Sequence, residues 1–336
     1  MEKIKLAVGW NAACGGCDVS LLDLEEAILE LAEVAEIVYW PVAMDFRRDD
    51  LRRRGTGEVD LGILCGAIRT DEQVEEARLF RDRCKALVAY GACAAFGGVC
   101  GLANLSSAAA ILETAYGETA STDNPEAVRP LPRSEVNGHV LSLPALEPSC
   151  RALCQVVDVD LTVPGCPPPS ELGHALVRAA IDHAHGGALP PRGTVLGSSK
   201  ALCDECPRVS TRTGQRMTAV RRPHQLLADP GLCFLEQGLI CLGLGTRGGC
   251  GASCLRVNQP CRGCFGPTDA MLDPGGDALS AIGSIAAQPH EDDLTQPART
   301  AAVRAIADLV GTFYRFTLAT AILSRRVEDQ PAAAKR

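Results

Sequence analysis

The sequence predicts an α/β protein, in which a parallel sheet with helices on both faces is followed by a loop-rich, cysteine-rich segment and a C-terminal helix. Three observations support this fold class. Strand-like and helix-like segments alternate over the first half of the chain, and regular patterns become rare after about Pro190. The 336 residues include 17 cysteines, and these concentrate in a few short stretches.

The first half contains strands and helices in regular alternation. Short apolar runs predict buried strands at residues 3–10, 36–40, 59–64, 86–90 and 156–163. Apolar residues at helical spacing predict helices at residues 20–33, 70–83 and 170–185. Ser20 is a candidate N-cap, and Thr70 with Gln73 has the pattern of a capping box. Such alternation is typical of a parallel sheet.

The second half of the chain has a different composition and fewer regular patterns. Pro190, Pro191 and Gly193 mark a joint, and residues 197–276 are rich in glycine, proline and cysteine. A segment that buries little apolar area needs another source of stability, and a bound metal supplies one. A helical pattern returns at residues 298–326 and is expected to pack back on the body. We therefore expect domains at 1–192 and 193–290, and a C-terminal helix and tail at 291–336.

Composition and charge limit the possible functions. The net charge is −8, and runs such as Arg52–Arg54 are too short for phosphate binding, so nucleic acid is not an expected partner. No apolar run reaches the roughly 18 to 20 residues that a membrane helix needs. The N-terminus enters a strand pattern at once, without an export leader. We expect a cytoplasmic protein.

The cysteine count indicates metal binding rather than disulfides. The cytosol keeps thiols reduced, and an odd number of cysteines leaves at least one unpaired. Four cysteines follow predicted strands, namely Cys14, Cys17, Cys93 and Cys166. Ligands of parallel sheets lie beyond the carboxyl ends of the strands, so these four thiols should meet at one edge.

Eight further cysteines divide into two groups of four. One group is Cys203, Cys206, Cys233 and Cys241, and the other is Cys250, Cys254, Cys261 and Cys264. Zinc is a competing ligand for such groups. Prolines beside Cys166, Cys206 and Cys261 favour iron–sulfur clusters, because such prolines recur in ferredoxin cluster motifs. Residues 247–254 differ from the nickel-ligand motif RxCGxC, because one extra residue lies before Cys250 and one after Gly251. A nickel site is therefore not expected here.

Several motifs together carry a resemblance to a known family. They are Cys14-Gly-Gly-Cys17-Asp18, Gly91-Ala-Cys93 with Gly97-Gly98, Pro164-Gly-Cys166-Pro-Pro, Cys203-x2-Cys206-Pro-Arg, and LEQGLICLGLGTRGGCGASC followed by NQPCRGCFGP. Over residues 3–290 the chain resembles the small, electron-transferring subunit of nickel–iron ([NiFe]) hydrogenases. The likeness is greatest to the gamma subunit of the cytoplasmic F420-non-reducing (methyl-viologen-reducing) type.

The resemblance implies a flavodoxin-like domain, a ferredoxin-like iron–sulfur domain and three [4Fe–4S] clusters. It assigns the proximal cluster to Cys14, Cys17, Cys93 and Cys166, the medial to Cys250, Cys254, Cys261 and Cys264, and the distal to Cys203, Cys206, Cys233 and Cys241. Many relatives have histidine at the position of Cys203, and some have no thiol at that of Cys254, so this chain is expected to hold three all-cysteine clusters.

The resemblance also implies the partners. The chain would have no catalytic residues of its own, and would relay electrons between the nickel–iron site of a large subunit and an acceptor subunit, a flavin or iron–sulfur protein. One alternative is the 20 kDa subunit of NADH–quinone oxidoreductase, which usually has adjacent cysteines and lacks the cluster-rich second half. The other is a zinc-binding structural module.

Five cysteines remain outside these groups. Four of them are interpreted as buried apolar filler, the ordinary role of a free cysteine: Cys84, Cys100, Cys150 and Cys154. Cys65 differs, because it follows a predicted strand at the same sheet edge as the proximal group, where relatives often carry an acidic residue. Our hypothesis is that Cys65 lies beside the proximal cluster as an alternative ligand.

Overall fold

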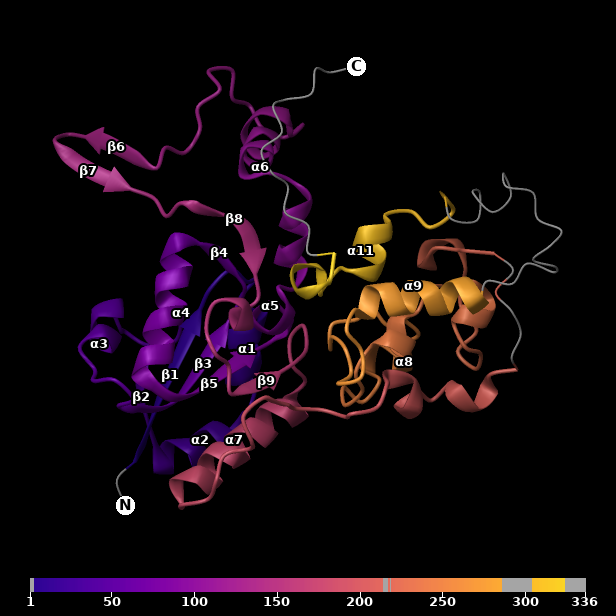
Figure 1. The fold of residues 1–336 in the computed structure, drawn as a ribbon, viewed down its shortest axis with the longest axis horizontal. Coiled ribbons are helices and arrows are strands. Elements are labelled where there is room, and N and C mark those ends of the chain that lie inside the picture. The colour runs from indigo at the N-terminus through magenta and orange to yellow at the C-terminus, as the bar shows by residue number, and fades with distance from the viewer. Residues whose placement is uncertain (1–2, 214–216, 218, 286–303, 324–336) are drawn as a thin grey trace.

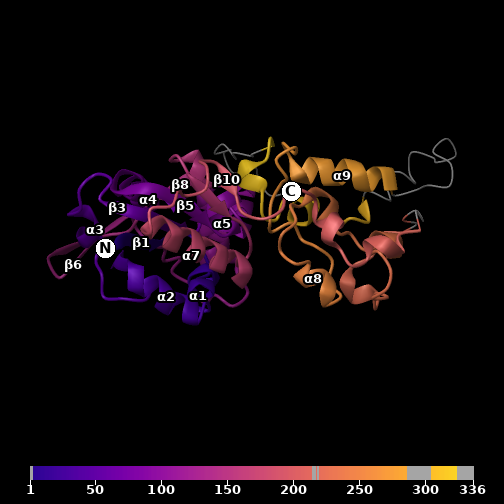
Figure 2. The same cartoon turned by 90° about the horizontal axis from the view of Figure 1, so that it is seen from below.

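The computed structural model describes residues 3–213, 217, 219–285 and 304–323. An α/β part and a loop-rich part lie side by side (Figures 1 and 2). The α/β part is built on a six-stranded sheet of β1 (Ile4–Trp10), β2 (Ala35–Tyr39), β3 (Val59–Cys65), β5 (Cys84–Tyr90), β9 (Leu161–Val163) and β10 (Thr194–Val195). Every pair of neighbouring strands is parallel.

The strand order identifies the type of sheet. It is β10-β9-β5-β3-β1-β2, so the chain starts in the interior, adds β2 on one side and then continues on the other. Counted along the chain, the first five strands of this sheet follow the flavodoxin-like order 2-1-3-4-5, and β10 is added at the far edge. The predicted fold class is therefore confirmed. The carboxyl ends of β1, β3, β5 and β9 lie at one edge of the sheet.

Helices cover both faces of the sheet. One face carries α1 (Gly16–Leu22), α2 (Glu26–Val34) and α7 (Ser170–Ala184), and the other carries α3 (Arg48–Arg52), α4 (Asp71–Arg83) and α5 (Ala92–Phe96). Adjacent strand residues serve opposite faces, as a strand requires. Ile63 packs under α7, whereas its neighbour Leu64 packs with Phe80 of α4.

Most elements predicted in the first half agree with the structure to within about two residues at each end, and two others differ by more. The helix predicted at 20–33 is two helices, α1 and α2, separated where Glu25 adopts a positive φ of 52°. Ser20 therefore lies inside α1, and its hydroxyl donates to the Cys17 carbonyl at 2.8 Å rather than capping a helix. The strand predicted at 156–163 keeps only its last three residues. The capping box of Thr70 and Gln73 is confirmed.

An excursion between β5 and β9 was not predicted. It contains a 3-10 helix at Val99–Leu105, α6 (Ala108–Glu113), a π-helical turn at Thr114–Glu118, and the hairpin of β6 (Arg133–Val136) and β7 (His139–Ser142). β8 (Leu146–Arg151) then pairs antiparallel with β4 (Ile68–Thr70). The hairpin projects from the body (Figure 1). Asn137-Gly138 is its turn, with both φ angles positive, as a two-residue hairpin prefers.

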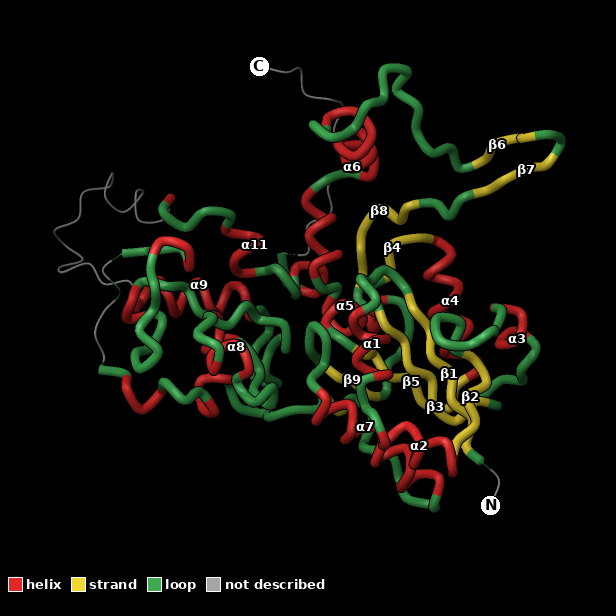
Figure 3. The backbone as a smooth tube through the Cα atoms, turned by 180° about the vertical axis from the view of Figure 1, so that it is seen from behind, coloured by secondary structure: helices red, strands yellow, loops and turns green. Residues whose placement is uncertain are grey.

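The loop-rich part has little regular structure, as predicted for residues 197–276 (Figure 3). It contains α8 (Ser253–Arg256), α9 (Pro274–Ile285) and 3-10 helices at Leu202–Glu205, Val209–Thr211, Pro223–Gln225, Leu235–Gln237 and Leu242–Gly245. The helix α9 was not predicted, although Asp273 accepts hydrogen bonds from the amides of Gly275 and Gly276, as an N-cap does. Leu235, Leu255 and Ile282 contribute to a separate small core.

The C-terminal segment, residues 304–323, contacts both parts. It contains α11 (Leu309–Phe313) and a 3-10 helix at Leu318–Thr320, so the helix is shorter than predicted; residues 298–303 and 324–326 lie outside the described residues. Gly98 donates to the Phe316 carbonyl at 3.1 Å, and the Gln155 side chain donates to the Ala319 carbonyl at 2.8 Å. Phe313 packs in the core of the loop-rich part. The segment packs back on the body, as expected.

The helices of the described residues are short. None of them alone is long and apolar enough to cross a membrane. One pair, residues 92–105 and 108–118, reaches the necessary length and apolar composition only when taken together, and it bends by 77°.

Candidate metal-cluster sites

The structure brings the first four cysteines to the carboxyl edge of the sheet. Cys14 and Cys17 lie where β1 leads into α1, Cys93 is in α5 after β5, and Cys166 follows β9. The charge of Cys17 acts on the thiols of both Cys93 and Cys166, which places the group within electrostatic reach. Cys17 is buried, whereas Cys14 and Cys166 are exposed. The group therefore opens to the surface on one side.

Two glycines leave room beside the sulfur atoms of this group. Gly91 has a φ of 88°, and a Cβ atom on it would lie 2.2 Å from the Cys17 sulfur. Gly98 has a φ of 57°, and a Cβ atom on it would lie 2.4 Å from the Cys93 sulfur. Only glycine suits both the backbone conformation and the close approach. Each glycine thus keeps the space next to a thiol clear.

Two further thiols contact the proximal group. Cys65, the last residue of β3, is fully buried and hydrogen-bonded to Cys17. That hydrogen bond, followed by burial, raises the pKa of Cys65. Cys100 is hydrogen-bonded to Cys93, and its sulfur lies 3.4 Å from the Ala12 carbonyl oxygen. Cys65 lies beside the proximal thiols, as the hypothesis requires, and Cys100 also contacts this group, although the sequence predicts only apolar filler at that position. The sequence feature that could have indicated the contact of Cys100 with Cys93 is the Gly97-Gly98 turn, which returns the chain toward Cys93.

The distal group lines one cavity in the loop-rich part. Its four members lie together there, namely Cys203, Cys206, Cys233 and Cys241. Burial raises the pKa of Cys203 to about 12, and the charges of the other three thiols add to the shift. Ionising such thiols without a bound cation is unfavourable, because burial and mutual repulsion act in the same direction.

A buried arginine holds the loops around the distal group. The Arg208 guanidinium stacks 4.0 Å from the centre of the Phe234 ring, and it donates to the Asp229 and Leu232 carbonyls at 2.8 Å each. It also donates to Asn258 at 2.6 Å, in the loop between Cys254 and Cys261. Its own backbone amide donates to the Cys206 sulfur at 3.4 Å. One side chain thus joins the distal and medial loops.

The medial group is built from a loop that turns on itself between residues 250 and 264. Cys264 lies within electrostatic reach of Cys250 and Cys254, and Cys261 within reach of Cys264. Burial raises the pKa of Cys264 to about 12. Cys261 is buried and Cys254 is exposed.

Polar side chains outside the cysteine motifs hold the ends of the medial loop. Glu205 accepts the Gly249 amide at 2.8 Å, and its other oxygen lies 3.8 Å from the Cys250 sulfur. Arg247, which is 4% exposed, donates to the Ser198 and Pro267 carbonyls at 3.0 and 3.1 Å. Neither role was predicted from the sequence. The sequence feature that could have indicated this role of Glu205 is its position between two predicted ligand cysteines, in Cys203-Asp-Glu205-Cys206.

Contacts between the groups place the three of them in a row. The backbone and the thiol of Cys166 both act on the Cys264 thiol, so the proximal group lies beside the medial group. The Cys261 amide donates to the Cys241 sulfur at 3.3 Å, which joins the medial group to the distal group. The medial group is therefore the middle member.

The donor sets are made entirely of thiols, which suits iron–sulfur clusters and also zinc. Among the residues that the structure describes, no three His, Cys, Asp or Glu side chains are placed to hold a single metal ion. Backbone amides that point at cysteine sulfurs, such as those of Arg208 and Cys261, are the outer contacts that tune clusters.

Comparison with known proteins relates this chain to subunits of hydrogenases. A family model described as NADH ubiquinone oxidoreductase, 20 Kd subunit, matches residues 14–179. The iron–sulfur subunit of the F420-non-reducing hydrogenase of Archaeoglobus profundus is 36% identical over 328 residues, which cover 96% of this chain and 99% of that protein. The corresponding subunit of the F420-non-reducing hydrogenase of Methanothermobacter marburgensis is 36% identical, with 98% and 99% covered.

A solved structure supports the fold. The structure of a [NiFeSe] hydrogenase from Desulfovibrio vulgaris Hildenborough covers 80% of this chain and 95% of its own, with a TM-score of 0.51 and 16% identity. The match to the 20 kDa family ends at residue 179, before the second set of cysteines, whereas the hydrogenase subunits match nearly the whole chain. The resemblance to an electron-transferring hydrogenase subunit is confirmed, and the NADH–quinone oxidoreductase alternative is not favoured. The chain belongs to the family of small iron–sulfur subunits of F420-non-reducing hydrogenases and is an oxidoreductase subunit.

Proposed function

We propose that this subunit binds three [4Fe–4S] clusters and relays electrons between a nickel–iron large subunit and an acceptor subunit. The observation that supports the proposal best is the row of thiol groups, in which Cys166 lies near Cys264 and the Cys261 amide donates to the Cys241 sulfur. Clusters bound in these groups would each supply a one-electron redox centre. The medial position would then be the only connection between the proximal and distal positions.

The twelve predicted ligands have the chemistry that three clusters need. Each group offers four thiols, so no cluster position depends on histidine or solvent. The proximal ligands would be Cys14, Cys17, Cys93 and Cys166, the medial ligands Cys250, Cys254, Cys261 and Cys264, and the distal ligands Cys203, Cys206, Cys233 and Cys241. Clusters bound there would compensate the repulsion among the buried thiols, because iron supplies positive charge. Free thiols of this number also suit a cytoplasmic location.

The large subunit would bind at the exposed side of the proximal group. Trp10, which is 47% exposed, ends β1, and Val19 and Leu22 project from α1 just after Cys17. Val42 and Met44 are exposed in the turn after β2, at the same edge of the sheet. Apolar side chains gathered on one surface are typical of protein–protein contacts. The acceptor subunit would approach the distal group at the other end of the row.

The metal content tests the proposal directly. Anaerobically purified full-length protein should contain about 12 iron atoms and a matching amount of sulfide per chain, since each four-iron cluster adds about four. The sample co-purified with its partner should also contain nickel and reduce methyl viologen in the presence of hydrogen. Near-stoichiometric zinc without iron would show that the chain is a zinc-binding structural module.

Gly91→Ala should remove the proximal cluster and leave the other two. The new methyl group would collide with the Cys17 sulfur at 2.2 Å, so iron content should fall by about four atoms per chain. Gly193→Ala is the matched control, because Gly193 has a similar φ of 85° but no atom within 4 Å of its Cβ position. Equal iron content in the two variants would contradict the assignment of Cys17.

Cys241→Ser should interrupt the relay at its distal end. Hydrogen-dependent methyl viologen reduction should fall at least about tenfold, because the variant removes a relay step. Hydrogen–deuterium exchange, which needs only the catalytic subunit, should stay at the wild-type level. Cys154→Ser, which changes a cysteine outside the three groups, should leave both rates unchanged. Wild-type viologen reduction in Cys241→Ser would exclude a distal role for that thiol.

Leu22→Arg should weaken assembly with the large subunit. A charge placed in an apolar contact must be desolvated, which costs several kcal/mol when no partner charge is present. Affinity purification of the variant should therefore recover little large subunit, while its iron content stays at the wild-type value. Leu227→Arg, at a leucine that is 93% exposed in the loop-rich part, is the control. Normal recovery with Leu22→Arg would move the interface elsewhere.

A further inference from the structure

A pocket of about 290 Å³ in the loop-rich part concentrates positive charge in a chain whose net charge is −8. Its charged lining comes from three separate segments. Arg222 precedes a 3-10 helix that contains His224, Arg262 lies in the medial loop, and Arg315 follows α11. The volume is near the lower limit for pockets that hold small organic ligands.

The guanidinium groups that line this pocket have no carboxylate partner in the described part of the chain. No ion pair within 4.0 Å joins Arg222, Arg262 or Arg315 to an acidic side chain among those residues. Arg262 and Arg315 are half-buried, and Arg315 donates only to the Gly311 carbonyl, at 3.1 Å. Leaving half-buried cations without a counter-charge is unfavourable.

Arg222, Arg262 and Arg315 line the same pocket, so the three cations share one space and repel one another. The thiols of Cys241 and Cys261 act on the pKa of Arg262 in the direction opposite to this repulsion.

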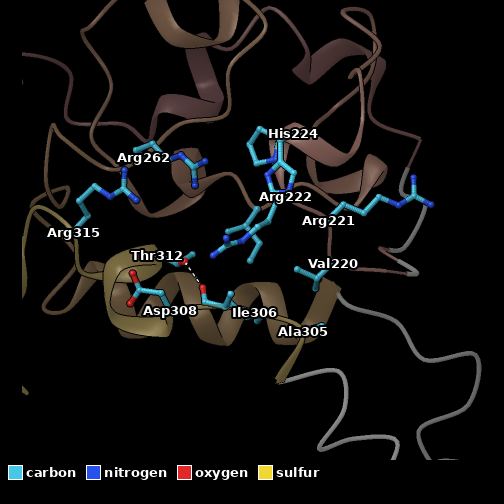
Figure 4. Close-up of a pocket in the computed structure, with 13 residues that line it drawn as sticks. Val220, Arg221, Arg222, His224, Arg262, Ala305, Ile306, Asp308, Thr312 and Arg315 are labelled. Atoms are coloured by element: carbon cyan, nitrogen blue, oxygen red, sulfur yellow. Dashed lines mark hydrogen bonds between the residues drawn. The ribbon is translucent and has the colours of Figure 1, made fainter. Parts of the chain in front are cut away.

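Figure 4 shows how the side chains are directed. Those of Arg222 and Arg262 point into the space above Thr312 and Ile306, whereas Arg221 extends away from it. Asp308 also lines the pocket, but one of its oxygens accepts the Gly311 amide at 2.9 Å and caps α11. Ile240, Val220 and Ile306 give the pocket an apolar portion.

We propose that this pocket binds a phosphate group, carried by a small organic molecule. Guanidinium groups match the geometry of phosphate oxygens and form paired hydrogen bonds with them. Cations from three segments surround a recess, which suits a compact, multiply charged anion better than the single carboxylates of a flat protein surface. The apolar portion would accept the carbon skeleton of the ligand. The site adjoins Cys241 and Cys261 without containing either.

Titration calorimetry of the anaerobically purified full-length chain with inorganic phosphate and pyrophosphate tests the proposal. We expect saturable binding at one site, with pyrophosphate the tighter ligand. Arg222→Ala should weaken binding at least about tenfold, or about 1.4 kcal/mol. The control is Arg221→Ala, which removes the same charge from the adjacent residue and should change affinity by less than about twofold. Both variants should keep the wild-type iron content.

Three results would overturn the proposal. The first is the absence of saturable binding of either probe, and the second is an equal loss in the two variants, which would indicate a general effect of charge. The third is a failure to bind phosphate together with weaker recovery of a protein partner in Arg222→Ala alone, which would make the pocket a protein contact. Because the readout is anion binding, these results are independent of the number of clusters bound and of hydrogenase activity.

Discussion

The amide of Cys261 donates to the sulfur of Cys241, and Cys166 lies close enough to Cys264 to act on its thiol. These two contacts put the three thiol groups in order, and most of the surrounding structure keeps them in place. The sheet presents Cys166 at its edge, and Arg247 ties the start and end of the medial loop to residue 198. A shift of one loop would change two sites at once, because each contact joins residues of different groups.

The second constraint on the structure is the electrostatic environment of the buried thiols. Thiols gathered in a protein interior resist ionisation, as the raised pKa values of Cys203 and Cys264 show. The protein places positive or partly positive groups around them, including the buried Arg208 and the backbone amides that point at sulfur. Most of these are backbone donors and fixed side chains, which need no rearrangement when a charge changes. This environment is suited to centres that gain and lose electrons.

The sequence predicted the sheet and the first thiol group together, for one physical reason. Cysteines that follow parallel strands must meet at the carboxyl edge, so Cys93 and Cys166 could be placed without knowing any side-chain contact. The split between α1 and α2 could not be predicted in that way, because it depends on the positive φ of Glu25, an uncommon conformation for that residue. The contact of Cys100 with Cys93 was missed because it depends on a turn. The projecting hairpin was missed because its residues bury little apolar area.

The C-terminal segment has a consequence for the order in which the molecule is made. Residues 304–323 carry the carbonyls of Phe316 and Ala319, which accept hydrogen bonds from the α/β part, and Phe313, which packs in the loop-rich part. These residues follow all 17 cysteines of this sequence, so they leave the ribosome after those cysteines. The contacts that residues 304–323 make with the two parts can therefore form only after all three thiol groups have been synthesised. During synthesis there is therefore an interval in which each part could bind metal before the C-terminal segment connects the two parts.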